Sequence, residues 1–256
     1  IRSKAFKKLD KLLFDFDTNF TRNGGKILWA NDSDEVKKMI YNILNQNKVK
    51  SIVKTKSSTL EEIDLTSYLE MKKIKVVDTN IGDFICSVFT ERPYSFKSSA
   101  AHKNTDQIAD IYTNQFGVKE NLNAKQLTIY TKNILRKEVY NPEALITGAN
   151  FLISNTGSIV FTENEGNILK STSFAPIHII VAGIDKMITS IDELSVLLPL
   201  SSLYDNNKNI SSLYSIINSP SSNEDKVQNL YLILLNNNRT NILSKEKQRN
   251  ILSCIQ

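Results

Sequence analysis

Two carboxylates and an amide follow directly on a β-type run, and this grouping is the one in the chain most suited to chemistry. The segment from Thr162 to Asn167 reads TENEGN and comes after the apolar run from Ser158 to Thr162. Sheets of α/β proteins present ligands at strand ends, and a glutamate carboxylate can act as a covalent nucleophile. The alternative is a turn whose side chains accept backbone N–H groups. The density of polar groups favours a ligand or interface role for Glu163, Asn164 and Glu165 over catalysis.

Two further polar segments flank predicted strands. Lys54, Lys56 and Ser57 follow the β-branched run Ser51 to Lys54, where they would meet a carboxylate or phosphate at the edge of a sheet. An ordinary solvated loop is an equally good interpretation of these three residues. The segment from Asn155 to Ser158 contains Asn155, Thr156 and Gly157, and is typical of a tight turn. Its N–H groups could also form an anion-binding nest, but simple turns are much commoner.

The two histidines are far apart in the sequence, and neither belongs to a group with zinc spacing. His178 lies in an apolar run after Pro176, which favours a hydrogen-bonded, half-buried side chain over a ligand-binding one. His102 is expected to cap a helix or lie at the surface. Cys86 is expected to be a small buried hydrophobe, and Trp29 and Phe151 are expected in the core.

Composition excludes several classes of protein. The chain has 256 residues, 41% of them hydrophobic, and a net charge of +5 with its lysines scattered along the sequence. This pattern favours a solvated surface over a nucleic-acid interface. No apolar stretch is long enough to span a bilayer, so we expect a cytoplasmic protein. Two cysteines give no disulfide framework, and neither a phosphate-binding loop nor a dinucleotide-binding fingerprint occurs.

Helical and strand patterns alternate, which favours an α/β fold with a mainly parallel sheet flanked by helices. Apolar spacing predicts a helix over 33–47 and a capped helix that begins at Thr59, and β-type runs predict strands at 51–54 and 75–78. Two more helices are predicted over 105–116 and 124–138. Further strands are predicted at 144–147, 158–162, 177–182, 213–218 and 230–235, with a capped helix after Ser190 and a last helix over 244–254.

Several motifs together resemble a known family. They include Gly148-Ala149-Asn150-Phe151, Asn155-Thr156-Gly157-Ser158, Glu163-Asn164-Glu165-Gly166-Asn167, Pro176-Ile177-His178 and Gly183-Ile184-Asp185-Lys186. Upstream, Lys54-Thr55-Lys56-Ser57, Glu61-Glu62-Ile63, the run from Asp78 to Asp83 and Ala101-His102-Lys103 fit the same pattern. In order and spacing they resemble the LUD domain of the LutB-type lactate-utilisation iron–sulfur proteins. The resemblance covers almost the whole chain.

This resemblance implies a fold similar to the ribose-phosphate isomerase, glucosamine-phosphate deaminase and CoA-transferase group. It also implies electron transfer through 4Fe-4S clusters in a longer protein, together with LutA- and LutC-type subunits that oxidise L-lactate to pyruvate. Cys254 resembles the first cysteine of the cluster-binding segment, and one thiolate cannot hold a cluster. We therefore expect no cofactor or metal in this fragment, which is interpreted as an N-terminal helical arm (1–23), a LUD domain (24–243) and the start of a truncated iron–sulfur segment (244–256).

Two other functions stay open. CoA-transferases carry a Ser-Glu-Asn-Gly motif with a nucleophilic glutamate, so an enzyme of CoA-transferase or isomerase type would use Glu163 on a small anionic substrate. Here the motif matches only at Glu163 and Asn164. The other alternative is a module that binds a small carboxylate. We further predict that the Glu163 segment and the 155–158 turn form one polar cluster, with the strand 177–182 returning alongside to bring His178 or Lys186 near the glutamates.

Overall fold

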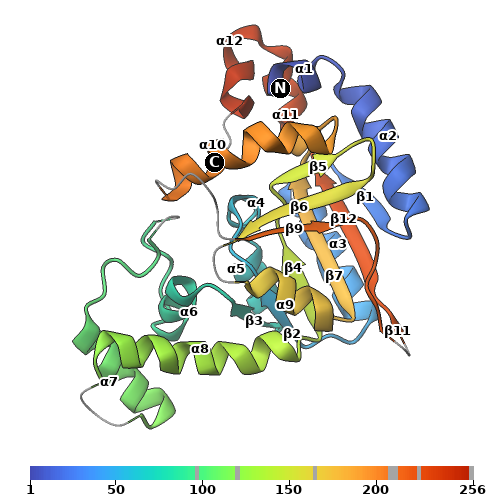
Figure 1. Ribbon diagram of the computed structural model, residues 1–256. Coiled ribbons are helices and arrows are strands. Elements are labelled where there is room, and N and C mark those ends of the chain that lie inside the picture. The colour runs from blue at the N-terminus through green and yellow to red at the C-terminus, as the bar shows by residue number, and fades with distance from the viewer. Residues whose placement is uncertain (96–97, 119–121, 164–165, 207–212, 224–225, 254–256) are drawn as a thin grey trace.

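The computed structural model describes residues 1–95, 98–118, 122–163, 166–206, 213–223 and 226–253. Helices and strands alternate through most of the chain (Figure 1). In chain order the elements are α1 (Arg2–Phe6), α2 (Leu9–Arg22), β1 (Lys26–Ala30), α3 (Ser33–Gln46), β2 (Ser51–Lys54), α4 (Ser58–Glu62), α5 (Leu65–Met71), β3 (Lys75–Asp78), α6 (Ile81–Val88), α7 (Thr105–Phe116), α8 (Ala124–Tyr140), β4 (Ala144–Thr147), β5 (Phe151–Ile153), β6 (Ser158–Glu163), α9 (Asn167–Phe174), β7 (Ile177–Gly183), η1 (Ile184–Lys186), β8 (Met187–Ile188), η2 (Ile191–Glu193), α10 (Leu194–Asn206), β9 (Leu213–Ile217), β10 (Ser222–Asn223), β11 (Lys226–Val227), β12 (Asn229–Leu235), α11 (Arg239–Ser244), α12 (Glu246–Arg249) and η3 (Asn250–Ser253).

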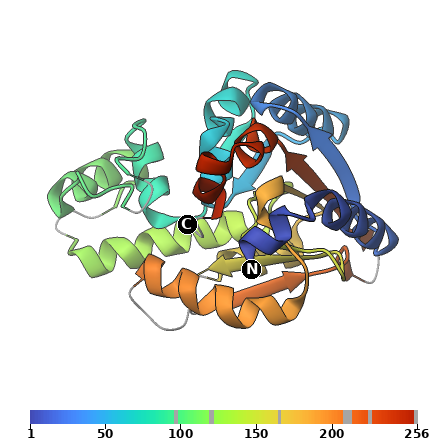
Figure 2. The same cartoon turned by 90° about the horizontal axis from the view of Figure 1, so that it is seen from above.

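Six parallel strands form the main sheet of the described residues, in the order β1-β12-β7-β4-β2-β3. The central strand β7 is buried along its whole length. Such a continuous apolar run is expected where helices or a second layer cover both faces of a parallel sheet. The strands all end at the same edge, which Figure 2 shows from above. The α/β fold with a mainly parallel sheet is therefore confirmed.

Helices α3, α4 and α5 cover one face of the main sheet. Val36, Ile40 and Leu44 on α3 are fully buried against Ile52 and Ile179 of the strands. Asp32 accepts hydrogen bonds from the N–H groups of residues 34 and 35, and so caps the start of α3. The spacing of these apolar residues is the helical period that predicts this element from sequence.

A second, smaller sheet covers the other face. Its order is β8-β5-β6-β9, with β5 and β6 antiparallel. Leu152 and Phe161 of this sheet pack against Ile180 of β7, and Phe16 and Phe20 of α2 complete this core. Helix α10 covers the outer face of the small sheet. The N-terminal helices therefore share one hydrophobic core with the strands.

The structure corrects several expectations. The strand at 158–162 does not lie beside the strand at 177–182, because β6 belongs to the small sheet and β7 to the main one. Helix α4 is capped by Ser57, one residue before α4 begins, and not by Thr59. The helix expected at 244–254 consists of α12 and the 3₁₀ turn η3, and Cys254 lies outside the described residues. Trp29 is 45% exposed because β1 is an edge strand, whereas Phe151 and Cys86 are buried as expected. None of the described helices has the length and apolar character that crossing a bilayer requires.

Candidate functional site

The candidate site lies where the order of the main sheet reverses. From β2 the chain passes through α4 and α5 on one face to reach β3, whereas from β4 it passes through the small sheet on the other face to reach β7. Strands β2 and β4 are neighbours. Their carboxyl ends therefore flank a topological switch point, the place where open α/β sheets bind ligands.

Lys54, the last residue of β2, has a buried ammonium group that lies between two carboxylates. Its Nζ lies 2.7 Å from Asp78 Oδ1 and 3.3 Å from Glu61 Oε1, and the residue is 2% exposed. Burial alone would lower the pKa of Lys54, but the charges of Asp78 and Glu61 outweigh it and hold this pKa above its usual value. Burial also disfavours the charged form of Asp78 and raises its pKa, and this effect outweighs the lowering by Lys54. Lys54 is therefore placed to hold the ends of β2 and β3 together, not to contact a ligand.

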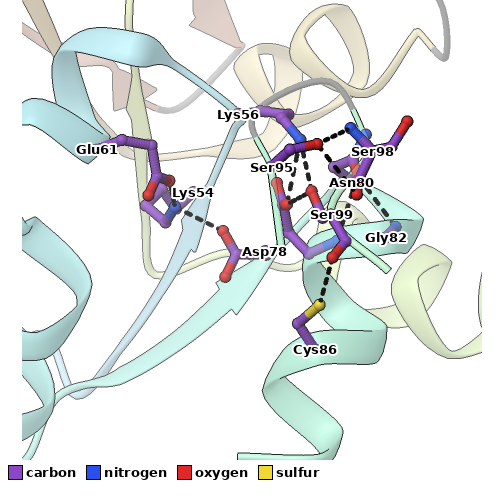
Figure 3. A network of polar contacts seen from close by, with 11 residues as sticks. Lys54, Lys56, Glu61, Asp78, Asn80, Gly82, Cys86, Ser95, Ser98 and Ser99 are labelled. Atoms are coloured by element: carbon purple, nitrogen blue, oxygen red, sulfur yellow. Dashed lines mark hydrogen bonds and ion pairs between the residues drawn. The ribbon is translucent and has the colours of Figure 1, made fainter. Parts of the chain in front are cut away.

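Two residues later, Lys56 belongs to a second network, with Ser99 (Figure 3) and with Asp83 of α6. Lys56 Nζ lies 2.6 Å from Ser99 Oγ and 3.3 Å from Asp83 Oδ1, and the Ser99 hydroxyl donates to the same carboxylate oxygen. Asp83 and Ser99 are buried, whereas the Lys56 side chain keeps 20% of its surface exposed. Asn80 caps α6 through the N–H groups of residues 82 and 83 and so fixes the direction of Asp83.

This Lys56–Asp83–Ser99 network is better suited to binding than to nucleophilic catalysis. A lysine activates a serine by accepting the proton of its hydroxyl, whereas here the Ser99 hydroxyl donates to the Asp83 carboxylate. The second oxygen of Asp83, Oδ2, is buried with no hydrogen-bond partner among the described residues. A small polar molecule that accepts from Lys56 and donates to Asp83 would complete the network.

Ser57 and Gly148 meet at the switch point itself. Ser57 Oγ accepts from the Leu60 N–H group at 3.5 Å, at the start of α4. A Cβ atom on Gly148, directly after β4, would overlap with the Ser57 hydroxyl. Only glycine therefore allows the chain that leaves β4 to pass this close to Ser57.

Glu163, at the end of β6, caps a helix. Its carboxylate accepts from the N–H groups of Ile168 at 2.7 Å and Leu169 at 3.0 Å, in the first turn of α9. The residue at the N-cap position is Gly166, which has no side chain to do this. Both carboxylate oxygens of Glu163 are therefore engaged by backbone donors. This is what the turn interpretation predicts, whereas a nucleophile needs an oxygen that is available to the substrate. Asn164 and Glu165 lie outside the described residues.

This capping role predicts the effect of two substitutions. We expect Glu163→Ala to lower the free energy of unfolding by about 1–2 kcal/mol, because two backbone donors lose their acceptor. Glu163→Gln, which keeps one acceptor oxygen, should cost clearly less. Urea denaturation measures both, with Glu70→Ala at an exposed position as the control. Equal stability of Glu163→Ala and the control would contradict the capping role.

The turn at 155–158 lies at the opposite end of β6 and packs against α2. The side chains of Asn19 and Asn23 donate to the carbonyls of Ser154 and Thr156. Gly157 has φ +67°, and a Cβ atom there would come within 2.7 Å of the Asn19 carbonyl carbon. The expected single cluster with Glu163 is therefore wrong, since the whole of β6 separates the two segments. Asn155, which begins this turn, is exposed.

His178 is fully buried, not half-buried, and within the described part of the chain no carboxylate is recorded as its hydrogen-bond or ion-pair partner. Its Nε2 lies 2.9 Å from Thr147 Oγ1, and its ring stacks on Phe161. Burial lowers its pKa from 6.5 to about 3. A hydrogen-bonded core histidine is confirmed, and the expected approach of His178 to the glutamates is not observed. Lys186 pairs instead with Asp185, at 3.9 Å.

Comparison with known proteins places this geometry in a family. The family model described as LUD domain matches residues 14–233. The chain belongs to the LUD domain family. Curated relatives include "Lactate utilization protein B" from Geobacillus sp. (strain WCH70), 31% identical, and from Bacillus licheniformis, 30% identical. Each alignment covers 100% of this chain and 54% of the relative, so the chain spans about half the length of these relatives. A crystal structure of a DUF162 family protein from Deinococcus radiodurans covers 89% of this chain and 98% of its own, with a TM-score of 0.48 and 12% identity.

A second buried ionic network lies further along the same edge of the LUD domain. Arg239 of α11 is 8% exposed, and its Nε lies 2.6 Å from Asp185 Oδ1. Its Nη2 lies 2.7 Å from Glu62 Oε2, at the end of α4. Burial tends to raise the pKa of Glu62, but hydrogen bonds from Arg239 and Asn237 outweigh it and hold this pKa below its usual range. The network ties α4, η1 and α11 together across β7 and β12.

The LUD domain thus assembles a site from some of the expected residues and from others that sequence reasoning did not assign. Lys56 and Ser57 lie at the switch point as expected, whereas Glu163, His178 and the 155–158 turn have separate structural roles. Asp83 and Ser99 were missed as site residues. Asp83 lies in the Asp78 to Asp83 motif of the family pattern, which is the signal that points to it. Ser99 carries no such signal, because its role depends on a contact 43 residues away.

Proposed function

We propose that this chain is the LUD domain of an iron–sulfur subunit in a complex that oxidises L-lactate to pyruvate, with LutA- and LutC-type proteins as its partner subunits. The observation that carries the proposal is the match over 100% of the chain to relatives named lactate utilization protein B. Membership of the LUD family supports it. In this proposal the domain provides docking surfaces and a small-molecule site, and electron transfer belongs to other parts of the longer protein.

The residues of this chain do not fit an iron–sulfur cluster. Such clusters are held by several closely spaced cysteine thiolates, and the chain has two cysteines. Cys86 Sγ is buried and lies 3.2 Å from the carbonyl oxygen of Ser99, and burial raises the pKa of this thiol. Cys254 lies outside the described residues. No group of three or more metal-binding side chains is found in the described part of the chain.

We therefore expect the purified 256-residue chain to be colourless, with iron well below one atom per chain. The longer protein, expressed without oxygen, should contain iron and sulfide and absorb in the visible range. Iron and acid-labile sulfide assays on both proteins measure this difference. Stoichiometric iron in the short chain, or none in the long one, would contradict the assignment of the clusters.

The Lys56–Asp83–Ser99 network is the part of the domain that we propose contacts a small carboxylate. Lys56 offers an ammonium group with part of its surface exposed, and beside it the buried Oδ2 atom of Asp83 has no hydrogen-bond partner among the described residues. An α-hydroxy acid carries the complementary pair, a carboxylate that accepts and a hydroxyl that donates. An enzyme that uses Glu163 as a nucleophile is not favoured, because both oxygens of that carboxylate bind backbone N–H groups.

A chimera tests the proposed function. Residues 1–256 replace the matching part of the Bacillus licheniformis relative in cells that lack that protein, and growth on L-lactate is the measurement. We expect the chimera to restore growth and the Lys56→Arg variant of it to grow as well. In the Lys56→Gln variant the rate of lactate use should fall about tenfold or more, since one charged hydrogen bond is lost. Lys48→Gln, at an exposed position, is the control. Immunoblots confirm equal protein levels, and unchanged lactate use by Lys56→Gln would overturn the role of the network.

A further inference from the structure

The first and last segments of this chain both carry an excess of positive charge. Residues 1–11 contain five basic residues and one acidic residue, and residues 244–253 contain three basic residues and one acidic residue. Together they carry a net charge of +6, against +5 for the whole chain. Helix α8 is the other basic element, with a net charge of +3 over residues 124–140. Along the sequence the lysines of these two segments are scattered, because the segments are more than 200 residues apart.

The fold brings the two segments together. The C-terminal turn η3 contacts α1, and α12 lies beside α1 at the top of Figure 1. Figure 2 shows the same neighbourhood from above. Six exposed lysines define this terminal basic surface: Lys4, Lys7, Lys8, Lys11, Lys245 and Lys247. None of the six forms an ion pair within the part of the chain that the structure describes.

The surroundings of this surface indicate which kind of partner it fits. An amphipathic helix binds a bilayer through its apolar face, but the apolar face of α2 is buried in the core through Leu12, Phe16 and Phe20. Single-stranded nucleic acids stack on several aromatic side chains, and within α1 and α2 Phe14 is the exposed aromatic, at 72%. Unpaired lysines in a cluster instead repel one another and cost folding stability. Clusters of this kind attract and orient proteins with acidic surfaces.

We propose that the terminal basic surface docks a protein partner through an acidic patch, in a weak association that is sensitive to salt. The lysines provide long-range attraction and orientation, and the exposed Phe14 beside them provides an apolar contact. Such small, charged contacts are typical of transient complexes, including those between electron-transfer proteins. The inference requires only the surface and its charge, so it does not depend on the chemistry at Lys56.

The test uses a fluorescent 20-residue polyglutamate peptide as an acidic probe of the 256-residue chain. Fluorescence anisotropy at low salt measures the dissociation constant, and amide shift changes in NMR spectra locate the contact. We expect the triple variant Lys4→Gln, Lys7→Gln and Lys11→Gln to weaken binding about tenfold, and 0.3 M salt to abolish it. The matched control is Lys125→Gln, Lys132→Gln and Lys137→Gln on α8, which removes the same net charge from another exposed basic surface.

Four outcomes separate the alternatives. Selective loss in the terminal variant, with shift changes in α1 and α12, supports the proposal. Equal loss in both triple variants would show attraction by net charge alone and overturn it. Binding to vesicles with 30% phosphatidylserine, but not to polyglutamate, would assign the surface to a membrane. Binding to a 20-nucleotide DNA, but not to polyglutamate, would assign it to nucleic acid, and either result overturns a protein partner.

Discussion

Replacing Arg239 by methionine is expected to lower the free energy of unfolding by about 3 kcal/mol, because the change leaves the buried Asp185 carboxylate without the cation that lies nearest to it. Arg239 binds Asp185 and Glu62 at 2.6 and 2.7 Å, and Asp185 is 5% exposed. Methionine fills much of the same volume, so the loss reports the charge more than a cavity. Urea denaturation, followed by circular dichroism, gives the midpoint and the slope of the transition.

An exposed arginine in an ion pair provides the matched control for Arg239. Arg92 lies 3.6 Å from Asp64, with 85% of its side chain exposed. Arg92→Met should cost less than about 1 kcal/mol, because solvent screens the pair and the exposed Asp64 carboxylate that remains keeps its hydration. A double variant with Arg239→Met and Asp185→Asn should recover part of the loss, since one unpaired charge is removed with its partner. If Arg239→Met and Arg92→Met were equally stable, the buried network would not hold the carboxyl edge together.

The second large effect is a loss of stability in acid that depends on His178. Its pKa is about 3 in the folded chain and about 6.5 when exposed, so between these values the unfolded chain binds a proton that the folded chain does not. The contribution of the uncharged His178 to the free energy of unfolding is present in full above pH 6.5 and is lost as the pH falls towards 3. The group contributes a slope of about 1.4 kcal/mol per pH unit within that window.

Removing the imidazole should remove this slope. His178→Gln keeps an amide that can bond to Thr147 but takes up no proton, so its stability should fall less steeply than that of the unmodified chain between pH 6.5 and pH 5. His102→Gln, at a residue near the surface whose side chain is 27% exposed and pairs with Glu91, is the control and should retain the slope because His178 is still present. Parallel loss of stability in the His178→Gln variant and the unmodified chain would show that His178 is not held uncharged in the core.

Sequence patterns predicted the main elements well because these depend on nearby residues. The strands at 51–54, 75–78 and 144–147 and the helix at 105–116 have the predicted bounds. Each is a short run whose β-branched content or apolar period is set within a few residues. The second sheet was missed because β5 and β8 are only three and two residues long, too short to show a period.

The candidate site was only partly predictable for the same reason. The position of Lys56 and Ser57 after a strand is a local feature, and it indicated the carboxyl edge of the sheet correctly. Glu163 also follows a strand, yet its carboxylate turns back to cap α9, because Gly166 cannot. Polar residues that end or follow a strand can therefore cap a helix or lie at the carboxyl edge of the sheet, and the difference depends on what packs next to each.

By itself, the sequence determined the family, the α/β class and the buried apolar strands, because these follow from local patterns and from motifs in a characteristic order along the chain. The tertiary structure decided which charged groups meet. It joined Lys56 to Asp83 and Ser99, and Arg239 to Glu62 and Asp185, and it brought α1 into contact with η3. These partners are 27 to more than 200 residues apart. Their meeting depends on strand order and on which face each connection crosses, and burial of the whole core sets both.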